Sequence, residues 1–65
     1  MAPAAADLRA ELARRRIPIY VLAARIEVHP TRLGSFLNER LPMSAEFAGR
    51  VAAAIQGLDV ERRGR

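Results

Sequence analysis

Residues 19–38 read IYVLAARIEVHPTRLGSFLN, and this stretch decides the fold that we predict for the chain. In each half, apolar residues recur at the three-and-four spacing of one helix face: Leu22, Ala23 and Ile26, then Leu33, Phe36 and Leu37. Proline at position 30 disfavours helical geometry at His29 but suits the first position of a new helix. Since each half is too short to be stable alone, we expect two helices, over 18–25 and 30–39, to pack across a turn.

The N-terminal sequence predicts another helix before this pair, from about residue 5 to residue 16. Its apolar face consists of Ala5, Leu8 and Leu12. Acidic residues lie toward its positive end and three arginines, at 14–16, lie at its negative end, so the charges complement the helix dipole. Pro18 ends this helix and begins the next one without the capping oxygen that serine or threonine supplies.

The C-terminal sequence predicts a helix over 45–56. Ser44 is a natural N-cap, and Gly57 is expected to end the helix. Its apolar stripe consists of Phe47, Ala48, Val51, Ala52 and Ile55. Residues 59–65 are short and charged, so a fifth helix there would have at most one turn.

These patterns predict an all-α fold in a single domain, a compact bundle of four or five helices. We expect its core to span residues 5–58, with flexible segments at 1–4 and 59–65. The chain has 65 residues and no cysteine, which excludes disulfides and thiolate metal sites. A domain of this size lies near the lower limit for folding without such staples, so close-packed aliphatic residues must supply the core.

The chain is basic, with a net charge of +4 and eleven arginines. A basic surface suits a polyanion, although charge alone does not separate DNA from RNA or acidic lipid. No run of about eighteen apolar residues occurs, and no basic segment precedes an apolar one at the N-terminus. We therefore expect neither a membrane span nor a signal peptide, and a cytoplasmic location.

The central stretch also matches a known pattern position by position, at Leu22, Ala23, Ile26, Glu27, Val28, Leu33 and Phe36. This pattern resembles the helix-turn-helix of the lambda repressor and Cro family, and the likeness extends from Leu8 to Leu58. The family needs alanine where its two helices cross closely. It prefers glycine in the turn where this chain has Glu27, and a positive φ there costs a non-glycine residue free energy.

The resemblance implies a lambda-repressor-like DNA-binding domain whose second helix of the pair enters the major groove. It assigns base reading to Pro30, Thr31 and Ser35, with Arg32 beside them in reach of a guanine or a phosphate. It implies a contact to the DNA backbone from Asn38, and we expect further backbone contacts from Arg15, Arg16, His29 and Arg40. The small polar residues of this helix favour close approach to another surface.

Several of these residues have a plainer interpretation. Gly34 costs about 1 kcal/mol relative to alanine within a helix, and it either permits close approach to DNA or is simply tolerated. Arg32 is alternatively an ordinary solvated arginine. The arginines at 14–16 form either a phosphate clamp or a solvated face that complements the helix dipole. We expect Tyr20 and Phe47 to pack in the protein rather than to stack on bases.

The sequence offers no catalytic constellation. His29 is the only histidine, and acid-base or metal chemistry would need a partner at a defined spacing, for which Glu27 in a turn is a poor substitute. Its expected role is to cap the following helix or to contact a phosphate. We therefore predict a protein that is not an enzyme and has no cofactor, no metal and no small-molecule ligand.

We expect a sequence-specific regulator of transcription that binds double-stranded DNA, similar to a small phage or plasmid repressor or Cro-like protein. It would occupy an operator as a homodimer, through Leu58, Val60 and the exposed end of the last helix. The alternatives are an antitoxin-type regulator and a helical protein-interaction module that does not read DNA. RNA binding ranks behind these, because the deep, narrow A-form groove does not admit a helix.

Overall fold

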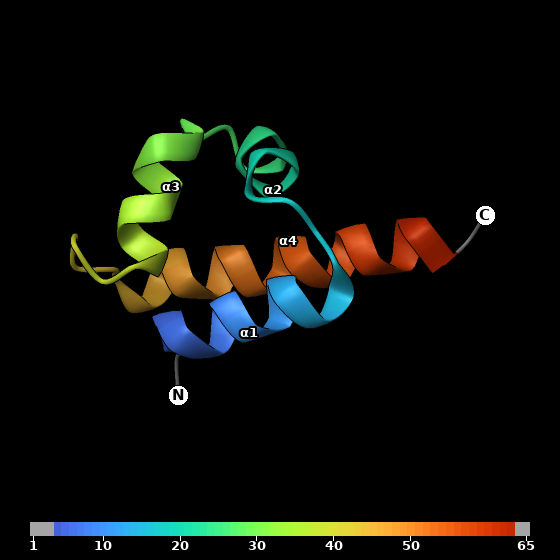
Figure 1. Ribbon diagram of the computed structural model, residues 1–65, viewed down its shortest axis with the longest axis horizontal. Helices are drawn as coiled ribbons and strands as arrows, with labels where there is room; N and C mark the ends of the chain where they lie inside the picture. Colours follow the sequence, from blue (N-terminus) through green and yellow to red (C-terminus); the bar gives the residue numbers. More distant parts are fainter. Residues whose placement is uncertain (1–3, 64–65) are drawn as a thin grey trace.

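The computed structural model describes residues 4–63, which form four α-helices and no strand. The helices are α1 (Ala5–Arg15), α2 (Ile19–Arg25), α3 (Pro30–Leu37) and α4 (Ala45–Arg63). Figure 1 shows α1 beside the long α4, with α2 and α3 drawn above them. α2 contacts both α3 and α4, and α3 also contacts α1. The molecule measures 35 × 25 × 18 Å. The predicted all-α fold is confirmed.

The core lies where the four helices meet. Every helix contributes to it, and its largest fully buried side chains are Leu8, Leu22, Leu33, Leu37, Val51 and Ile55. Burying a side chain of this size contributes about 1.5–3 kcal/mol. Ala23 is also fully buried on α2, which contacts α3 directly. The burial of Ala23 beside this helix contact agrees with the small side chain expected there.

Three helices end in the same way, with a charged residue in the left-handed conformation: Arg16 (φ 56°), Glu27 (φ 57°) and Glu39 (φ 62°). The amide of each donates to the carbonyl three residues back, at 3.2–3.3 Å. The next amide donates to a carbonyl five residues back, at 2.9 Å in all three cases. These bonds define the Schellman motif, in which glycine usually occupies the left-handed position. Each charged residue there carries a conformational cost that glycine avoids.

Side-chain caps begin two of the helices. His29 Nδ1 accepts a hydrogen bond from the Thr31 amide at 3.2 Å, and Ser44 Oγ accepts one from the Phe47 amide at 3.1 Å. Both predicted caps are confirmed, and each satisfies an amide that has no partner within its helix. The residue before α2, Pro18, provides no side-chain cap, also as predicted.

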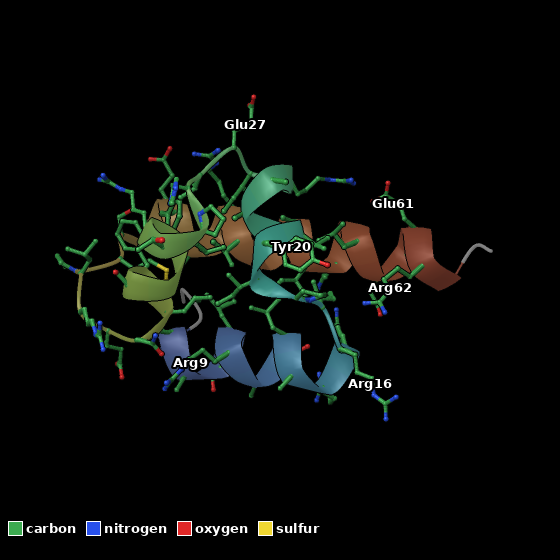
Figure 2. All side chains as sticks on the ribbon, turned by 45° about the horizontal axis from the view of Figure 1, so that its top comes forward. Arg9, Arg16, Tyr20, Glu27, Glu61 and Arg62 are labelled. Atoms are coloured by element: carbon green, nitrogen blue, oxygen red, sulfur yellow. The ribbon has the colours of Figure 1, made fainter. Side chains whose placement is uncertain are left out.

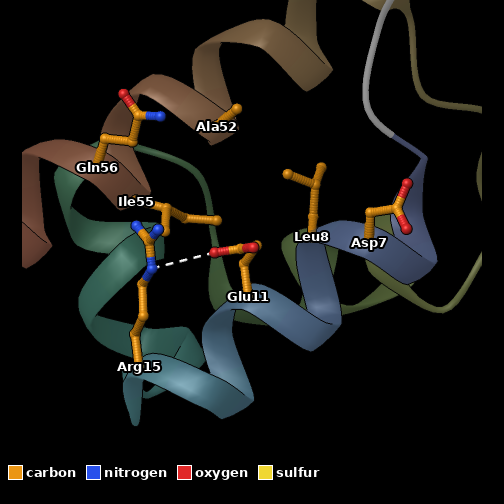
Figure 3. A pocket seen from close by; sticks show the side chains of 7 residues that line it. All are labelled: Asp7, Leu8, Glu11, Arg15, Ala52, Ile55 and Gln56. Carbon is orange, nitrogen blue, oxygen red and sulfur yellow. Dashed lines mark ion pairs between the residues drawn. The ribbon is translucent and has the colours of Figure 1, made fainter.

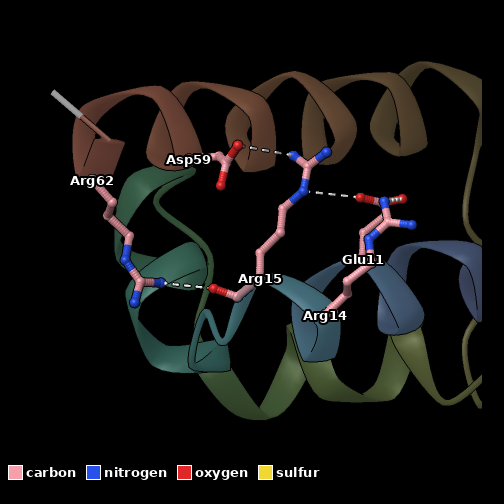
Figure 4. Close-up of polar contacts among 5 residues, drawn as sticks. All are labelled: Glu11, Arg14, Arg15, Asp59 and Arg62. Atoms are coloured by element: carbon pink, nitrogen blue, oxygen red, sulfur yellow. Dashed lines mark hydrogen bonds and ion pairs between the residues drawn. The ribbon is translucent and has the colours of Figure 1, made fainter.

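The predicted end of the last helix is wrong. α4 continues through Gly57 to Arg63, so residues 59–63 are its last turns and no separate fifth helix follows within the described chain. The physical reason is tertiary: Arg62 Nη1 donates to the carbonyl of Arg15 at 3.1 Å (Figure 4) and to that of Arg16 at 2.9 Å. This contact attaches the end of α4 to the end of α1, and it offsets the modest cost of one glycine within a helix.

Two smaller expectations concern the ends of the chain and the membrane. We expected residues 1–4 and 59–65 to be flexible. Residues 1–3 and 64–65 lie outside the described residues, Ala4 is the N-cap residue of α1, and residues 59–63 belong to α4. Within residues 4–63, no helix combines the length and the apolar character needed to cross a membrane.

Candidate nucleic-acid interface

The outward face of α3 is polar and made of short side chains. Thr31, Ser35 and Asn38 lie on the side of the helix opposite the fully buried Leu33 and Leu37, as the spacing of 3.6 residues per turn requires. Thr31 and Asn38 are exposed, as is Pro30 at the start of the helix, and Ser35 is half-buried. Of the predicted base-reading residues, Thr31 and Ser35 therefore share this face, while Pro30 is exposed at the start of the helix.

Gly34 borders this face. It lies three residues after Thr31 and four residues before Asn38, so all three are neighbours on the surface of α3. A Cβ atom built on Gly34 would have no atom of the protein within 4 Å, apart from its own chain neighbours and the local helix backbone. Packing within the chain thus gives no reason for glycine here. The result is a low point on the surface of α3 where another molecule can approach the backbone.

The hydroxyl of Ser35 donates to the carbonyl of Thr31 at 3.1 Å, so its proton is used within α3. Its lone pairs remain able to accept a hydrogen bond from outside. The exposed hydroxyl of Thr31 can both donate and accept. The two residues therefore offer different hydrogen-bonding patterns to a ligand lying on α3.

Arg32 occupies the edge of the face rather than its centre. Its guanidinium carbon lies 5.7 Å from the centroid of the Phe36 ring, which in turn lies 4.8 Å from the ring of Phe47 on α4. A cation held over an aromatic ring gains electrostatic attraction and is partly fixed in position. This geometry holds Arg32 over the Phe36 ring, and the contact between Phe36 and Phe47 confirms that Phe47 packs in the protein.

The arginines at the end of α1 differ in what they contact. Arg15, predicted to bind the DNA backbone, is held between α1 and α4: its Nε lies 3.0 Å from Glu11 Oε2 and its Nη1 lies 4.0 Å from Asp59 Oδ2 (Figure 4). Its side chain is only 24% exposed. Arg14 also pairs with Glu11. Arg16 is exposed, and its side chain contacts no acidic group among the described residues.

The structure does not bring Arg16 together with α3. Figure 2 places Arg16 at one end of the molecule, while α3 lies toward the other end with α2 between them. On α2 itself, Tyr20 is 67% exposed, so the expectation that it packs in the protein is wrong. Position 20 falls outside the apolar stripe of α2, whose buried residues are Leu22 and Ala23.

The remaining predicted backbone contacts surround α3. His29 is exposed and caps its start, while Asn38 and Arg40 are exposed at its end. Asn38 Oδ1 also accepts a hydrogen bond from Arg9 Nη1, at 3.5 Å. Arg9 was not predicted as a site residue, and no local pattern reveals it, because it precedes Asn38 by 29 positions in the sequence.

A shallow hollow of about 220 Å³ lies between α1 and α4 (Figure 3). It is lined by Asp7, Leu8, Glu11, Arg15, Ala52, Ile55 and Gln56. None of these residues belongs to α2 or α3, so the hollow is separate from the face described above. The charges of Arg15 and Glu11 within it compensate each other. In residues 4–63, no three histidine or acidic side chains form a group able to hold a metal ion.

No family model, curated protein or solved structure matches this chain. The function is therefore inferred from the geometry of α3 and of the residues around it. The accessible polar face, the glycine on its border and the basic residues at both ends of the molecule are the features that need an explanation.

Proposed function

We propose that this chain binds double-stranded DNA in a sequence-specific way, with α3 lying in the major groove. The observation that carries the proposal is the face of α3, where short polar side chains surround a glycine that packing within the chain does not require. The major groove admits an α-helix, and hydroxyl groups can read the donors and acceptors of base edges there. A short, smooth face allows the helix backbone to approach those edges closely.

The connection between α2 and α3 supports a helix-turn-helix of the lambda repressor and Cro type. Glu27 adopts φ 57° at the position where that family prefers glycine. The Val28 amide then donates to the carbonyl of Ala23 at 2.9 Å, closing the end of α2 immediately before His29 caps α3. The fully buried Ala23 leaves room for the two helices to cross.

In this proposal, residues at the start and middle of α3 read bases, namely Pro30, Thr31 and Ser35. Arg32, placed at the edge of the face by its contact with Phe36, lies better for a phosphate than for a guanine. Backbone contacts come from His29, Asn38, Arg40 and Arg16. Arg15 stabilises the contact between α1 and α4 through its two ion pairs, which leaves it a structural role.

The proposed biological role is that of a small cytoplasmic repressor or Cro-like regulator, of phage or plasmid type, that occupies its operator as a homodimer. Two recognition helices about 34 Å apart would contact successive turns of one face of DNA. Val60, 68% exposed near the end of α4, is available for the dimer contact. The expectation that Leu58 takes part is wrong, because Leu58 is 9% exposed and packs in the core.

The deciding experiment is selection of bound sequences from random duplex DNA, followed by footprinting on the selected site. A repeated half-site, protected by the chain, would support the proposal and would give the half-site spacing. Recovery of unrelated sequences after several rounds would contradict sequence-specific reading.

A salt titration distinguishes the alternative of a protein-interaction module. Phosphate binding loses affinity steeply as ionic strength rises, because neutralised phosphates release counterions. A mainly apolar protein interface lacks this dependence. Failure of the chain to bind any duplex at low salt would favour that alternative.

A further inference from the structure

We propose that Arg9 of α1 and Asn38 at the end of α3 together clamp one phosphate of duplex DNA. This inference depends on the proposed function and extends the DNA-binding site from α3 onto α1. The ligand is the phosphodiester backbone, so the clamp adds affinity and fixes the orientation of α3 without reading sequence.

The contact between the two side chains leaves most of their donors available. Arg9 Nη1 donates to Asn38 Oδ1 at 3.5 Å, which uses one of the five N–H groups of the guanidinium. Because the amide oxygen is the acceptor, both N–H groups of the Asn38 amide remain able to donate. Both side chains are exposed. A phosphate beside the pair can therefore accept hydrogen bonds from two elements of the fold at once.

The charge of Arg9 has no counterpart within residues 4–63. Arg14 and Arg15 pair with Glu11, and Arg25 pairs with Glu61 on α4. Within residues 4–63, the side-chain hydrogen bond of Arg9 is to the neutral amide of Asn38. It also lies in the N-terminal half of α1, where the helix dipole does not favour a cation. Neither an ion pair nor the dipole uses the charge of Arg9, so this charge is available to an anionic partner.

The dimensions of α3 bring this pair to the rim of the groove. A helix of eight residues, such as Pro30–Leu37, is about 12 Å long, and the major groove is about 12 Å wide. When Thr31, near the start of α3, faces base edges, Asn38 lies at the far end, where the phosphates run. Figure 2 shows Arg9 on α1, on the same side of the molecule as the end of α3.

The test compares Arg9→Ala with Arg50→Ala, which removes the same charge from an exposed position on α4 that has no role in the proposed interface. Binding of a short mixed-sequence DNA duplex is measured by fluorescence anisotropy at several salt concentrations. Losing one phosphate contact should reduce the slope of log affinity against log salt by about 0.9 per protomer. When the salt concentration rises fourfold, both proteins lose affinity for the duplex. The factor by which Arg9→Ala loses affinity should be about 3.5 times smaller than the factor for the unchanged chain.

Asn38→Ala and the double variant test the shared phosphate. If both side chains hold one phosphate, the loss of affinity in the double variant should be smaller than the product of the two single losses. Circular dichroism and thermal midpoints show whether each variant is folded, and Arg9→Lys, which keeps the charge, should keep most of the slope.

The outcomes separate this inference from the proposed function. Suppose that the unchanged chain binds duplex DNA, and that Arg9→Ala and Arg50→Ala both show the same salt slope as the unchanged chain. This result would contradict the phosphate clamp but would leave the proposed DNA binding through α3 intact. Independent, multiplicative losses at positions 9 and 38 would also contradict a shared phosphate. If the unchanged chain shows no salt-dependent binding to duplex DNA, the proposed function itself fails, and the clamp fails with it.

Discussion

The guanidinium of Arg62 lies 2.9 Å from the carbonyl oxygen of Arg16, and this hydrogen bond joins the last turn of α4 to the end of α1. Carbonyls at the C-terminal end of a helix have no partners within it. Arg62 Nη1 also donates to the carbonyl of Arg15 (Figure 4), so one side chain satisfies two such groups. The length of α4 is therefore connected with the way in which α1 ends.

Replacing Arg62 with alanine should lower the free energy of unfolding by about 0.5–1 kcal/mol, because an exposed hydrogen bond contributes little net free energy. Urea midpoints provide the measurement, and Arg50→Ala provides the control. If the two variants have equal midpoints, the contact does not stabilise the fold.

Replacing Gly57 with alanine should raise the free energy of unfolding by about 0.5–1 kcal/mol, because Gly57 lies within α4. The new Cβ would lie 3.5 Å from Arg25 Nη2, which is an ordinary contact. Thermal and urea midpoints measure the change. A lower midpoint would indicate that the helix ends at Gly57 in solution, as the sequence alone suggested.

Replacing Glu27 with glycine should stabilise the protein by about 0.5–1 kcal/mol, since glycine adopts the observed φ of 57° without the clash of a Cβ. The gain is smaller than the full conformational cost because glycine also has more freedom in the unfolded chain. The matched control is Ala53→Gly, an exposed helical position at which glycine should destabilise by a similar amount. Loss of stability in Glu27→Gly would reveal a favourable contact of the carboxylate.

Replacing Gly34 with alanine should separate folding from binding. The substitution should stabilise the free protein by up to about 1 kcal/mol, because alanine is the better helix former and the new Cβ meets nothing within 4 Å. If α3 enters the major groove as proposed, the substitution should weaken specific DNA binding, since the methyl group would lie on the border of the face proposed to approach the bases. Gly49→Ala on α4 also meets nothing and should stabilise without affecting binding. Unchanged affinity in Gly34→Ala would remove the main support for close approach.

Substitutions on α3 and at the end of α1 should have different effects on DNA binding and on stability. Thr31→Ala or Ser35→Ala should reduce discrimination between operator and scrambled duplex by about 1–3 kcal/mol if the residue makes a good base contact. Arg16→Ala should weaken all duplexes alike and reduce the salt slope by about 0.9. Arg15→Ala should mainly lower stability, because its charge is used in ion pairs. Titrations of both duplexes at several salt concentrations, with urea unfolding, distinguish these results. Unchanged discrimination in both α3 variants would contradict the proposed recognition face.

The sequence by itself determined the features that depend on neighbours along the chain. The spacing of Leu22, Ala23 and Ile26 defined the buried face of α2, and Pro30 marked the start of α3. The caps at His29 and Ser44 were also predictable, because a side chain caps an amide two or three residues away. These interactions span a few residues, so the local sequence contains all the information they need.

Only the tertiary structure decided which charged side chains are exposed to bind another molecule, and where the last helix ends. Arg15 and Arg16 are adjacent and chemically identical, yet one is held between α1 and α4 and the other is exposed. Arg9 meets Asn38 across 29 residues, and Arg62 meets Arg16 across 46. Such contacts depend on how whole helices pack, which the periodicity of any one segment does not specify. Whether a glycine ends a helix also depends on distant contacts. Gly57 does not end α4, because Arg62 in the following turns contacts the end of α1 and favours continuation of the helix.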